Sequence, residues 1–453
     1  MKKKLMYLFC IICFLLPITS IQAFHNLDNS NLDTTKADNS KILLFKGHVS
    51  DWSNDKALSF ASIFLSTSGI SNISNGEGYF TFKIPMYAYD DTLCFSYLGY
   101  KTSKIYLKGL VDEFLMNSEK NKSSNNNSDK SDVITIDLGD ISLAPIALEL
   151  SASIIRPEDP AFIVQSAINK IPDNYTQERM HMKAFYREMI KKGNHYVTLT
   201  EAALNISKQP YSPYSMADQC AIYKGRSSVD WEKIDSIFVK FRGGITSSLE
   251  SDIMKSPFLA VDPRYITDYY NFTFATPVEI DGRTQYVINI TQKEHIQQIL
   301  FSGKLYIDME SLALTRADLS LNCDVNKQKA TALFISKKPR KMRTEIEYAT
   351  YQIRYREFEG KWLFDYVRTE FKFKSRWKSQ WFYRHYTITS EMASTDINSE
   401  EVKIPRKLRI NHGDITLDKV QDFRDDTFWK DYNIIEPETD IQKVIRKVIK
   451  RLD

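Results

Sequence analysis

The sequence predicts a mainly β protein, with a small N-terminal sandwich followed by a large antiparallel β-meander or half-barrel that carries a few helices. Three observations lead to this prediction. Between residues 42 and 107, short apolar runs alternate with turn residues, at a spacing typical of a β-sandwich. From residue 181 to 420 the chain is a series of β-type segments joined by turns. Helical periodicity is confined to short stretches near residues 160 and 440.

The N-terminus has the order of a secretory signal peptide. Three lysines at positions 2–4 precede an apolar run at 5–16, and Ala23 offers a small residue for cleavage. The run is shorter than the roughly 20 residues that span a bilayer, although an uncleaved anchor is the alternative. We therefore expect residues 1–23 to direct export and the polar residues 24–41 to form a disordered leader.

Charge and cysteine content argue against two classes of function. The formal net charge is +4, and removal of three signal-peptide lysines would leave +1, so we expect no nucleic-acid partner. Outside the predicted signal peptide, Cys94, Cys220 and Cys323 have no Cys-x-x-Cys spacing. They indicate neither a disulfide framework nor a zinc site, and at most one disulfide could form.

The N-terminal sandwich is predicted strand by strand. An Asn-Gly-acid-Gly turn at 75–78 tolerates positive φ and joins two of the strands. A polar low-complexity segment at 117–132 is expected to be a disordered insertion before the last strand, with an interdomain linker as the alternative. The predicted strands are Ile42–Val49, Ala57–Ser66, Tyr79–Ile84, Thr92–Leu98, Lys101–Leu107 and Val133–Leu143.

Several strings in this region carry a family resemblance. Lys46-Gly47-His48-Val49, Asn75-Gly76-Glu77-Gly78-Tyr79-Phe80 and Phe95-Ser96-Tyr97-Leu98-Gly99-Tyr100 resemble the carboxypeptidase-regulatory-like domain, over about residues 43–145. That family is a transthyretin-like sandwich common in envelope proteins of the Bacteroidetes. The resemblance implies a sandwich at 42–145 without the catalytic zinc residues of the metallocarboxypeptidases that some such domains accompany.

A linker and a helix are expected at 146–180. Asp159 is a good N-cap and Pro160 suits the first helical position, while Pro172 is expected to end the helix. The string that begins at Ala184 resembles the uncharacterised second half of the same Bacteroidetes proteins. The resemblance therefore indicates which proteins are related but does not predict an activity.

The β-rich domain is expected at 181–435. Its clearest element is a long hairpin, Thr344–Phe358 and Trp362–Trp377, turning at Glu359-Gly360. The string Gly303–Asp308 resembles a strand of half-barrel lipoprotein carriers and sorting proteins. Further strands are predicted at Tyr286–Thr291, Gly303–Met309 and Leu312–Leu321.

The last segment, 436–453, is predicted to be an amphipathic helix that starts at Pro437 and carries basic residues toward its end. It either packs on its own β-domain or lies on a membrane surface.

Motifs for catalysis are absent from the sequence. No histidine has a glutamate three residues later, and there is no His-Glu-x-x-His, Gly-x-Ser-x-Gly or phosphate-loop string. Glu188 and Glu201 could face each other across a hairpin, and a carboxylate-pair enzyme is the alternative that they leave open. We therefore expect no catalytic, cofactor-binding or metal-ligating residue.

The densest aromatic cluster supplies the candidate ligand contacts. Trp377, Trp381 and Tyr383, together with Arg376, could form a platform for a sugar or a lipid headgroup. The alternative is that these side chains cover a β-core.

The sequence thus favours a non-catalytic protein that is exported to the periplasm or the outer membrane. It would dock to or bind an envelope protein, a glycan or a lipid, with peripheral membrane contact as a further option. The alternative function is a periplasmic carrier or binder of lipid or lipoprotein in the half-barrel. That alternative requires the apolar strand faces between 181 and 420 to line a hollow of several hundred Å³ and not a filled core.

Overall fold

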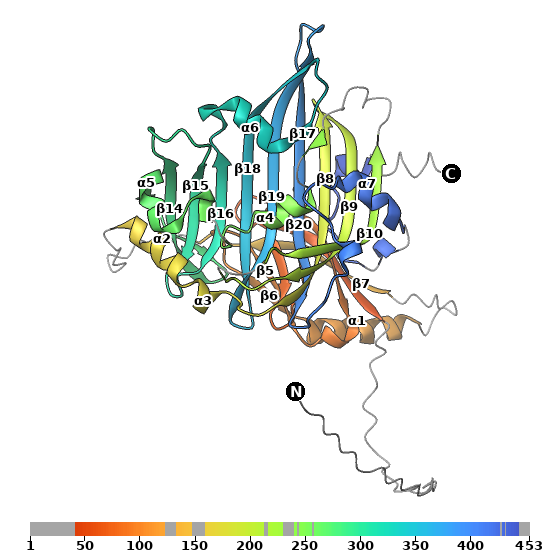
Figure 1. Ribbon diagram of the computed structural model, residues 1–453. Coiled ribbons are helices and arrows are strands. Elements are labelled where there is room, and N and C mark those ends of the chain that lie inside the picture. Colours follow the sequence, from red (N-terminus) through yellow and green to blue (C-terminus); the bar gives the residue numbers. More distant parts are fainter. Residues whose placement is uncertain are drawn as a thin grey trace, which may run out of the picture. The chain divides into compact units, whose positions relative to one another are not determined.

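The computed structural model describes residues 41–122, 133–146, 159–212, 216–229, 240–241, 244–255, 258–425, 428–430 and 432–443. The predicted signal peptide and residues 24–40 of the predicted leader lie outside these ranges. None of the helices in the described ranges is long and apolar enough to cross a membrane. The fold class is confirmed, because small N-terminal sheets are followed by one large antiparallel sheet (Figure 1).

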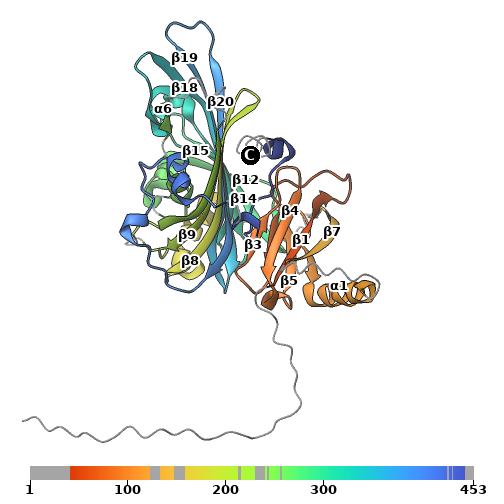
Figure 2. The ribbon, with the colours of Figure 1, turned by 90° about the vertical axis from the view of Figure 1, so that its right-hand side faces the viewer.

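Two small sheets form the N-terminal sandwich (Figure 2). One sheet has the order β4-β1-β7, in which β1 pairs with β4 antiparallel and with β7 parallel, and the other has the order β3-β2-β5-β6. Their shared core includes Phe45, Ile63, Phe82 and Phe95, all of them fully buried. The strands are β1 (Ile42–Asp51), β2 (Ser62–Leu65), β3 (Ser71–Ile73), β4 (Tyr79–Pro85), β5 (Thr92–Ser96), β6 (Ser103–Tyr106) and β7 (Val133–Leu143).

Two predictions for the sandwich were wrong in part. The strand predicted at 57–66 is limited to β2, because Phe60 has a φ of 61° and the backbone turns there. The segment 117–132 is not wholly an irregular insertion, since its first six residues end helix α1 (Leu107–Lys122). Leu107 and Val111 bury one side of α1 in the sandwich core, and the helix continues from them into the polar residues. Residues 123–132 lie outside the described ranges.

The connection to the large sheet contains α2 (Pro160–Asn169) and α3 (Ile171–Asn174). The predicted start of α2 is confirmed, because the Asp159 side chain accepts a hydrogen bond of 2.8 Å from the backbone N–H of Ala161. The predicted end of the helix is confirmed, since α2 ends at Asn169, shortly before Pro172. Pro172 itself lies in the first turn of α3, where the missing N–H of proline leaves no helical hydrogen bond unmade.

The large sheet has eleven strands in the order β10-β9-β8-β20-β19-β18-β16-β15-β14-β12, with β13 paired beside β14, and every pairing is antiparallel. The predicted hairpin is confirmed as β18 and β19, with Glu359 and Gly360 both at positive φ (51° and 74°) in the turn. The strands are β8 (Met180–Lys192), β9 (His195–Lys208), β10 (Gln219–Val229), β12 (Tyr270–Phe274), β13 (Val278–Ile280), β14 (Arg283–Gln292), β15 (Phe301–Asp308), β16 (Leu314–Leu321), β18 (Met342–Phe358), β19 (Lys361–Trp377) and β20 (Arg384–Asn398).

The remaining elements are short helices, single 3₁₀ turns and a two-stranded sheet. The longer ones are helices α4 (Ile245–Glu250), α5 (Ile266–Tyr269), α6 (Lys327–Phe334) and α7 (Thr416–Val420), and the two-stranded sheet of β11 (Lys240–Phe241) and β17 (Ile335–Lys337). Single 3₁₀ turns are η1 (Met86–Ala88) in the sandwich and, after it, η2 (Phe258–Ala260), η3 (Pro263–Tyr265), η4 (Cys323–Val325), η5 (Arg406–Leu408), η6 (Gln421–Phe423) and η7 (Phe428–Lys430). In the predicted C-terminal helix, residues 439–443 are helical, 436–438 precede the helix, and 444–453 lie outside the described ranges.

The sandwich and the large sheet are joined by polar contacts. Ser71 of β3 donates a hydrogen bond of 2.9 Å to the backbone oxygen of Ser394 in β20. Arg356 of β18 donates one of 3.1 Å to the backbone oxygen of Gly69. A late segment, residues 428–430 and 432–436, which we call the C-terminal strap, contacts both the sandwich and β8. The sandwich therefore covers one face of the sheet. The domain limits expected from the sequence, 42–145, 146–180 and 181–435, stay predictions.

Candidate functional site

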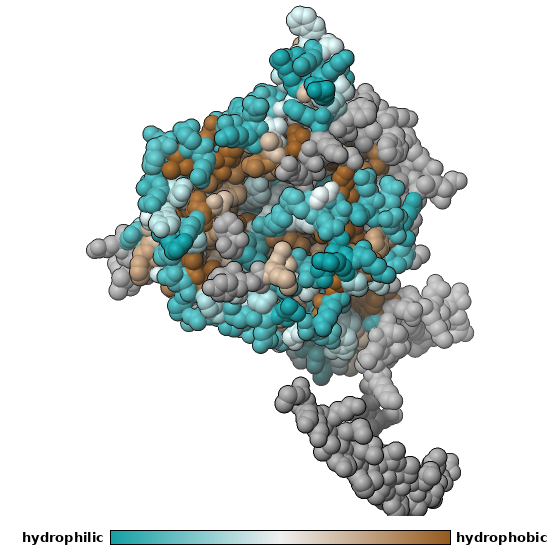
Figure 3. All heavy atoms as spheres, in the orientation of Figure 1, coloured by the Kyte–Doolittle hydropathy of each residue, from teal (hydrophilic) through white to brown (hydrophobic). Residues whose placement is uncertain are grey.

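A cavity of about 1090 Å³ lies on the sheet face that carries α4, opposite the sandwich. Its floor is formed by β16, β18, β19 and β20, which are neighbours in the sheet. The cavity is surrounded by α4, the turn after it, α6 and residues 410–412. Figure 3 shows the same face, where apolar residues gather in a recess framed by polar ones. The large sheet is therefore not fully covered on this side, as the carrier hypothesis requires.

One part of the wall is apolar. Side chains alternate along a strand with a period of two, so Leu319 and Leu321 of β16 face the cavity together. The register places Leu319 opposite Tyr351, and Phe371 opposite Ile388, so adjacent strands contribute to one continuous apolar surface. The apolar wall consists of Ile299, Phe301, Leu319, Leu321, Leu333, Phe334, Tyr351, Ile353, Phe371 and Ile388.

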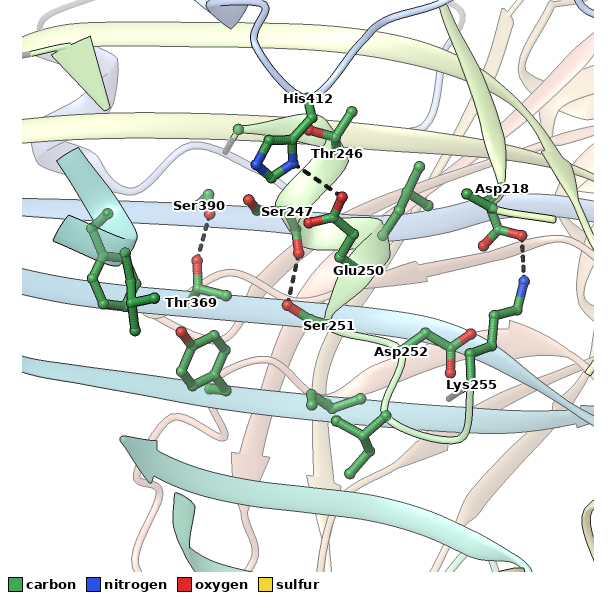
Figure 4. Close-up of a pocket in the computed structure, with 18 of the residues that line it drawn as sticks. Asp218, Thr246, Ser247, Glu250, Ser251, Asp252, Lys255, Thr369, Ser390 and His412 are labelled. Carbon is green, nitrogen blue, oxygen red and sulfur yellow. Dashed lines mark hydrogen bonds and ion pairs between the residues drawn. The ribbon is translucent and has the colours of Figure 1, made fainter. Parts of the chain in front are cut away.

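A second part of the wall is polar (Figure 4). Thr369 and Ser390 lie on the floor with their hydroxyl oxygens 2.6 Å apart. Ser247 and Ser251 of the α4 region lie beside them in the view of Figure 4. Glu250 stands 3.1 Å from His412, measured from Oε1 to Nδ1. This part offers hydrogen-bonding groups to a ligand whose other end contacts the apolar wall.

Glu188 of β8 lies in the polar part of the cavity wall. The Tyr186 hydroxyl donates a hydrogen bond of 2.9 Å to Glu188 Oε2. Burial raises the pKa of the Glu188 carboxyl, and the hydrogen bond from Tyr186 lowers it by a smaller amount. A carboxyl of this kind accepts a hydrogen bond from a ligand, or donates one when it is protonated.

An ion cluster fixes the turn that follows α4. Lys208 of β9 lies 2.8 Å from Asp218 Oδ2 and 2.7 Å from Asp252 Oδ2, and all three side chains are buried. Tyr211 and Tyr355 donate hydrogen bonds of 2.8 and 2.9 Å to the Asp252 carboxylate. Lys255 pairs with Asp218, so two lysines balance two aspartates. These charges are satisfied by one another and hold the turn against the sheet.

The two glutamates considered as a catalytic pair do not meet. Glu188 is paired in register with Thr200, whereas Glu201 is paired with Arg187, so the two carboxylates point to opposite faces of the sheet. The carboxylate-pair enzyme that the sequence left open is thereby excluded for these residues. Within the described ranges, no group of three or more His, Cys, Asp and Glu side chains is placed to hold a metal ion.

The predicted ligand contacts Arg376, Trp377, Trp381 and Tyr383 lie elsewhere, at the far end of β19 and in the turn to β20. None of the four lines the cavity, and their role as ligand contacts stays a prediction. The cavity residues were missed, although the period-two alternation in β16, β18 and β19 contained the signal. What the sequence could not show is which apolar faces remain uncovered.

Comparisons with known proteins describe the sandwich better than the large sheet. The family model for the CarboxypepD_reg-like domain matches residues 45–130, so the predicted domain is present, while the Bacteroidetes lineage stays a prediction. No curated protein matches the sequence.

Three solved structures are similar to this chain over about half of its length. A DUF1329 family protein from Desulfovibrio piger is 12% identical, covers 55% of this chain and 95% of its own, and has a TM-score of 0.24. The LolA superfamily protein NE2245 from Nitrosomonas europaea is 14% identical over 55% of this chain and 97% of its own, with a TM-score of 0.22. MucB in complex with MucA(peri) is 9% identical over 54% of this chain and 100% of its own, with a TM-score of 0.17.

Proposed function

We propose that this protein is a non-catalytic binding protein of the cell envelope, and that the cavity on its large sheet holds an acyl chain of a lipid or of a lipid-modified protein. The observation that carries the proposal is the cavity itself. Its volume of about 1090 Å³ is slightly above the usual range of small-molecule sites, roughly 300–1,000 Å³. Its apolar wall is formed by adjacent strands, with a limited set of polar groups at one side.

The cavity lining also indicates the headgroup. Glu188 and Glu250 bring carboxylates to the polar part, whereas the nearby lysines are already paired with Asp218 and Asp252. An anionic headgroup would be repelled by these carboxylates, and a neutral or cationic one would donate hydrogen bonds to them. We therefore propose an acyl chain with a neutral or cationic head.

The remaining parts of the chain fit this role. The predicted signal peptide supports export to the periplasm or the outer membrane. The sandwich covers the opposite sheet face and leaves the cavity accessible, which supports a docking role for it toward an envelope protein or a glycan.

The first test is native mass spectrometry of the protein purified gently from the envelope, followed by solvent extraction. We expect an acyl-bearing molecule at about one per chain. Leu333 lines the cavity and is 52% exposed, so Leu333→Asp should keep the fold. The variant should weaken binding by about tenfold or more, because the aspartate would place a charge against the acyl chain of the ligand. Leu408→Asp is the matched control, at a site 42% exposed that does not line the cavity. A bare chain, or equal retention by both variants, would refute the proposal.

The headgroup is tested separately by titration with dodecylamine, dodecanol and dodecyl phosphate. We expect dodecylamine and dodecanol to bind more tightly than dodecyl phosphate, and Glu188→Gln with Glu250→Gln to reduce that preference. Tight binding of the phosphate would contradict only the headgroup assignment, whereas no binding of any of the three would contradict the use of the cavity.

A further inference from the structure

The ends of β18, β19 and β20 carry an unusual combination of side chains. We call residues 338–343 and 376–384 the aromatic-basic tip. These two segments contain seven lysines and arginines and no acidic residue: Lys338, Arg340, Lys341, Arg343, Arg376, Lys378 and Arg384. Figure 2 shows this end of the strands extending beyond the neighbouring parts of the sheet.

The fold brings the two segments together. Arg343 of β18 is paired with Arg376 of β19, and the backbone N–H of Lys378 donates a hydrogen bond of 2.8 Å to the oxygen of Lys341. Arg384 of β20 is paired with Ser375 on the other side of β19. Three strand ends therefore gather their cations around a single turn.

That turn displays two large apolar side chains to solvent. Trp381 is 91% exposed and Phe382 is 86% exposed, more than any other large apolar side chain in the described part of the protein. Contiguous exposed apolar side chains with a polar rim, unlike single scattered ones, are a feature of interaction sites.

The turn is held in a defined conformation. Arg376 Nη1 donates a hydrogen bond of 2.8 Å to the oxygen of Gln380, whose N–H is bonded to the oxygen of Trp377 at 2.9 Å. The Tyr383 ring lies below Lys374 and Arg376, at 5.4 and 5.0 Å from the cationic centres. These contacts fix the base of the turn and leave Trp381 and Phe382 pointing outward.

We propose that the aromatic-basic tip binds the surface of a membrane that contains anionic lipid. Trp381 and Phe382 enter the boundary between headgroups and acyl chains, a region that suits aromatic rings. The surrounding cations contact headgroup phosphates, and each cation near an anionic surface strengthens association about fivefold at low salt. The inference rests on the tip alone and is independent of what the cavity holds.

The test is flotation of the full chain with vesicles of phosphatidylethanolamine and phosphatidylglycerol, and with vesicles of phosphatidylcholine alone. We expect binding to the anionic vesicles that weakens as salt is added, because salt screens exposed charges. Trp381→Ser with Phe382→Ser should weaken binding by about tenfold or more. Lys341→Ser with Lys378→Ser should weaken it to a similar degree and reduce the dependence on salt.

Two controls separate the tip from other lipid contacts. Trp52→Ser removes an exposed tryptophan of the sandwich, 70% exposed, and should leave vesicle binding unchanged. Leu333→Asp at the cavity should also leave it unchanged, so a failure of the cavity proposal would not count against the tip. Wild-type binding by the Trp381 and Phe382 variant, equal binding to both kinds of vesicle, or no binding to either would overturn the inference.

Discussion

Arg187 and Glu201 face each other across β8 and β9, with Arg187 Nη2 2.6 Å from Glu201 Oε1 and neither side chain more than 1% exposed. Arg226 of β10 pairs with the same carboxylate. Arg187 also donates a hydrogen bond of 2.7 Å to the backbone oxygen of Ile435 in the C-terminal strap. One buried carboxylate thus pairs with two arginines, and one of those arginines holds the strap against the large sheet.

Glu201→Gln should destabilise the protein, because the buried Arg187 and the partly exposed Arg226 would lose their counter-charge. Loss of one partner of a buried ion pair costs about 3–5 kcal/mol, which a shift of the urea midpoint would measure. Glu391→Gln offers a comparison, since Glu391 pairs with Arg368, which is partly exposed, and a smaller loss is expected there. An unchanged midpoint for Glu201→Gln would show that the ion pairs contribute nothing to stability.

The same carboxylate predicts a pH dependence. Burial alone would raise the pKa of Glu201, but Arg187 and Arg226 outweigh burial and lower it from 4.5. The unfolded chain therefore binds the proton more readily, and the stabilisation present above pH 4.5 is lost as the pH falls through the native pKa. The difference in unfolding free energy between wild type and Glu201→Gln should shrink below that pH. A constant difference would contradict the assignment.

Glu188 should behave in the opposite way. Its pKa is raised from 4.5 by burial, so the native state holds the proton more tightly and stability falls as the pH rises above 4.5 toward the native pKa. Glu188→Gln should therefore flatten the pH profile and stabilise the protein at pH 7 by about 1 kcal/mol. Thermal unfolding between pH 4 and pH 8 would test this, and a lower stability of the variant at pH 7 would contradict it.

Gly69 controls the contact between the sandwich and the large sheet. A Cβ at this position would lie 1.9 Å from the backbone oxygen of Ile397, so Gly69→Ala must displace the backbone. We expect a loss of about 1–3 kcal/mol and faster amide exchange in β3. Gly109→Ala is the control, because a Cβ there meets no atom within 4 Å and alanine favours helix α1. Equal stability of the two variants would show that the junction adapts freely.

The side chain of Asn433 bonds to the backbone of β4 at the edge of the sandwich, where a further strand would otherwise pair. Its side-chain oxygen accepts a hydrogen bond of 2.7 Å from the N–H of Lys83, and its amide donates one of 2.8 Å to the oxygen of Lys83. Asn433→Ala leaves both backbone groups of β4 buried without these partners and should cost about 2–4 kcal/mol in the unfolding free energy. Asn289→Ala, which removes one hydrogen bond of 3.4 Å, should cost far less in the same urea titration. Comparable losses would contradict this role for Asn433.

Local rules predicted much of the fold. The β18–β19 hairpin follows from the alternation of apolar and polar residues along both strands and from residues at Glu359-Gly360 that accept positive φ. Both signals lie within one short stretch of sequence. The cap at Asp159 is also a local feature. Helix α1 was missed because a polar, low-complexity end concealed the apolar stripe that includes Leu107 and Val111.

The site could not be predicted in the same way. Leu319, Phe371 and Ile388 contribute to one surface only when β16, β18, β19 and β20 pair in the right register. Whether such a surface is covered depends on α4 and α6, which pack from outside the sheet. The opposite orientation of Glu188 and Glu201 likewise depends on a register that the sequence does not show.

The C-terminal strap affects when the protein can complete its folding. Asn433 bonds to Lys83 across 350 positions of sequence, and Arg187 reaches Ile435 across 248. A ribosome adds about 5–20 residues per second, so the sandwich and most of the sheet are synthesised well before the segment that holds them together. Until that segment arrives, the edge of β4 and the charges of Arg187 and Glu201 lack part of their native surroundings. Final assembly is therefore expected to be a late step in the life of the chain, and a period in which chaperones and proteases have access to it.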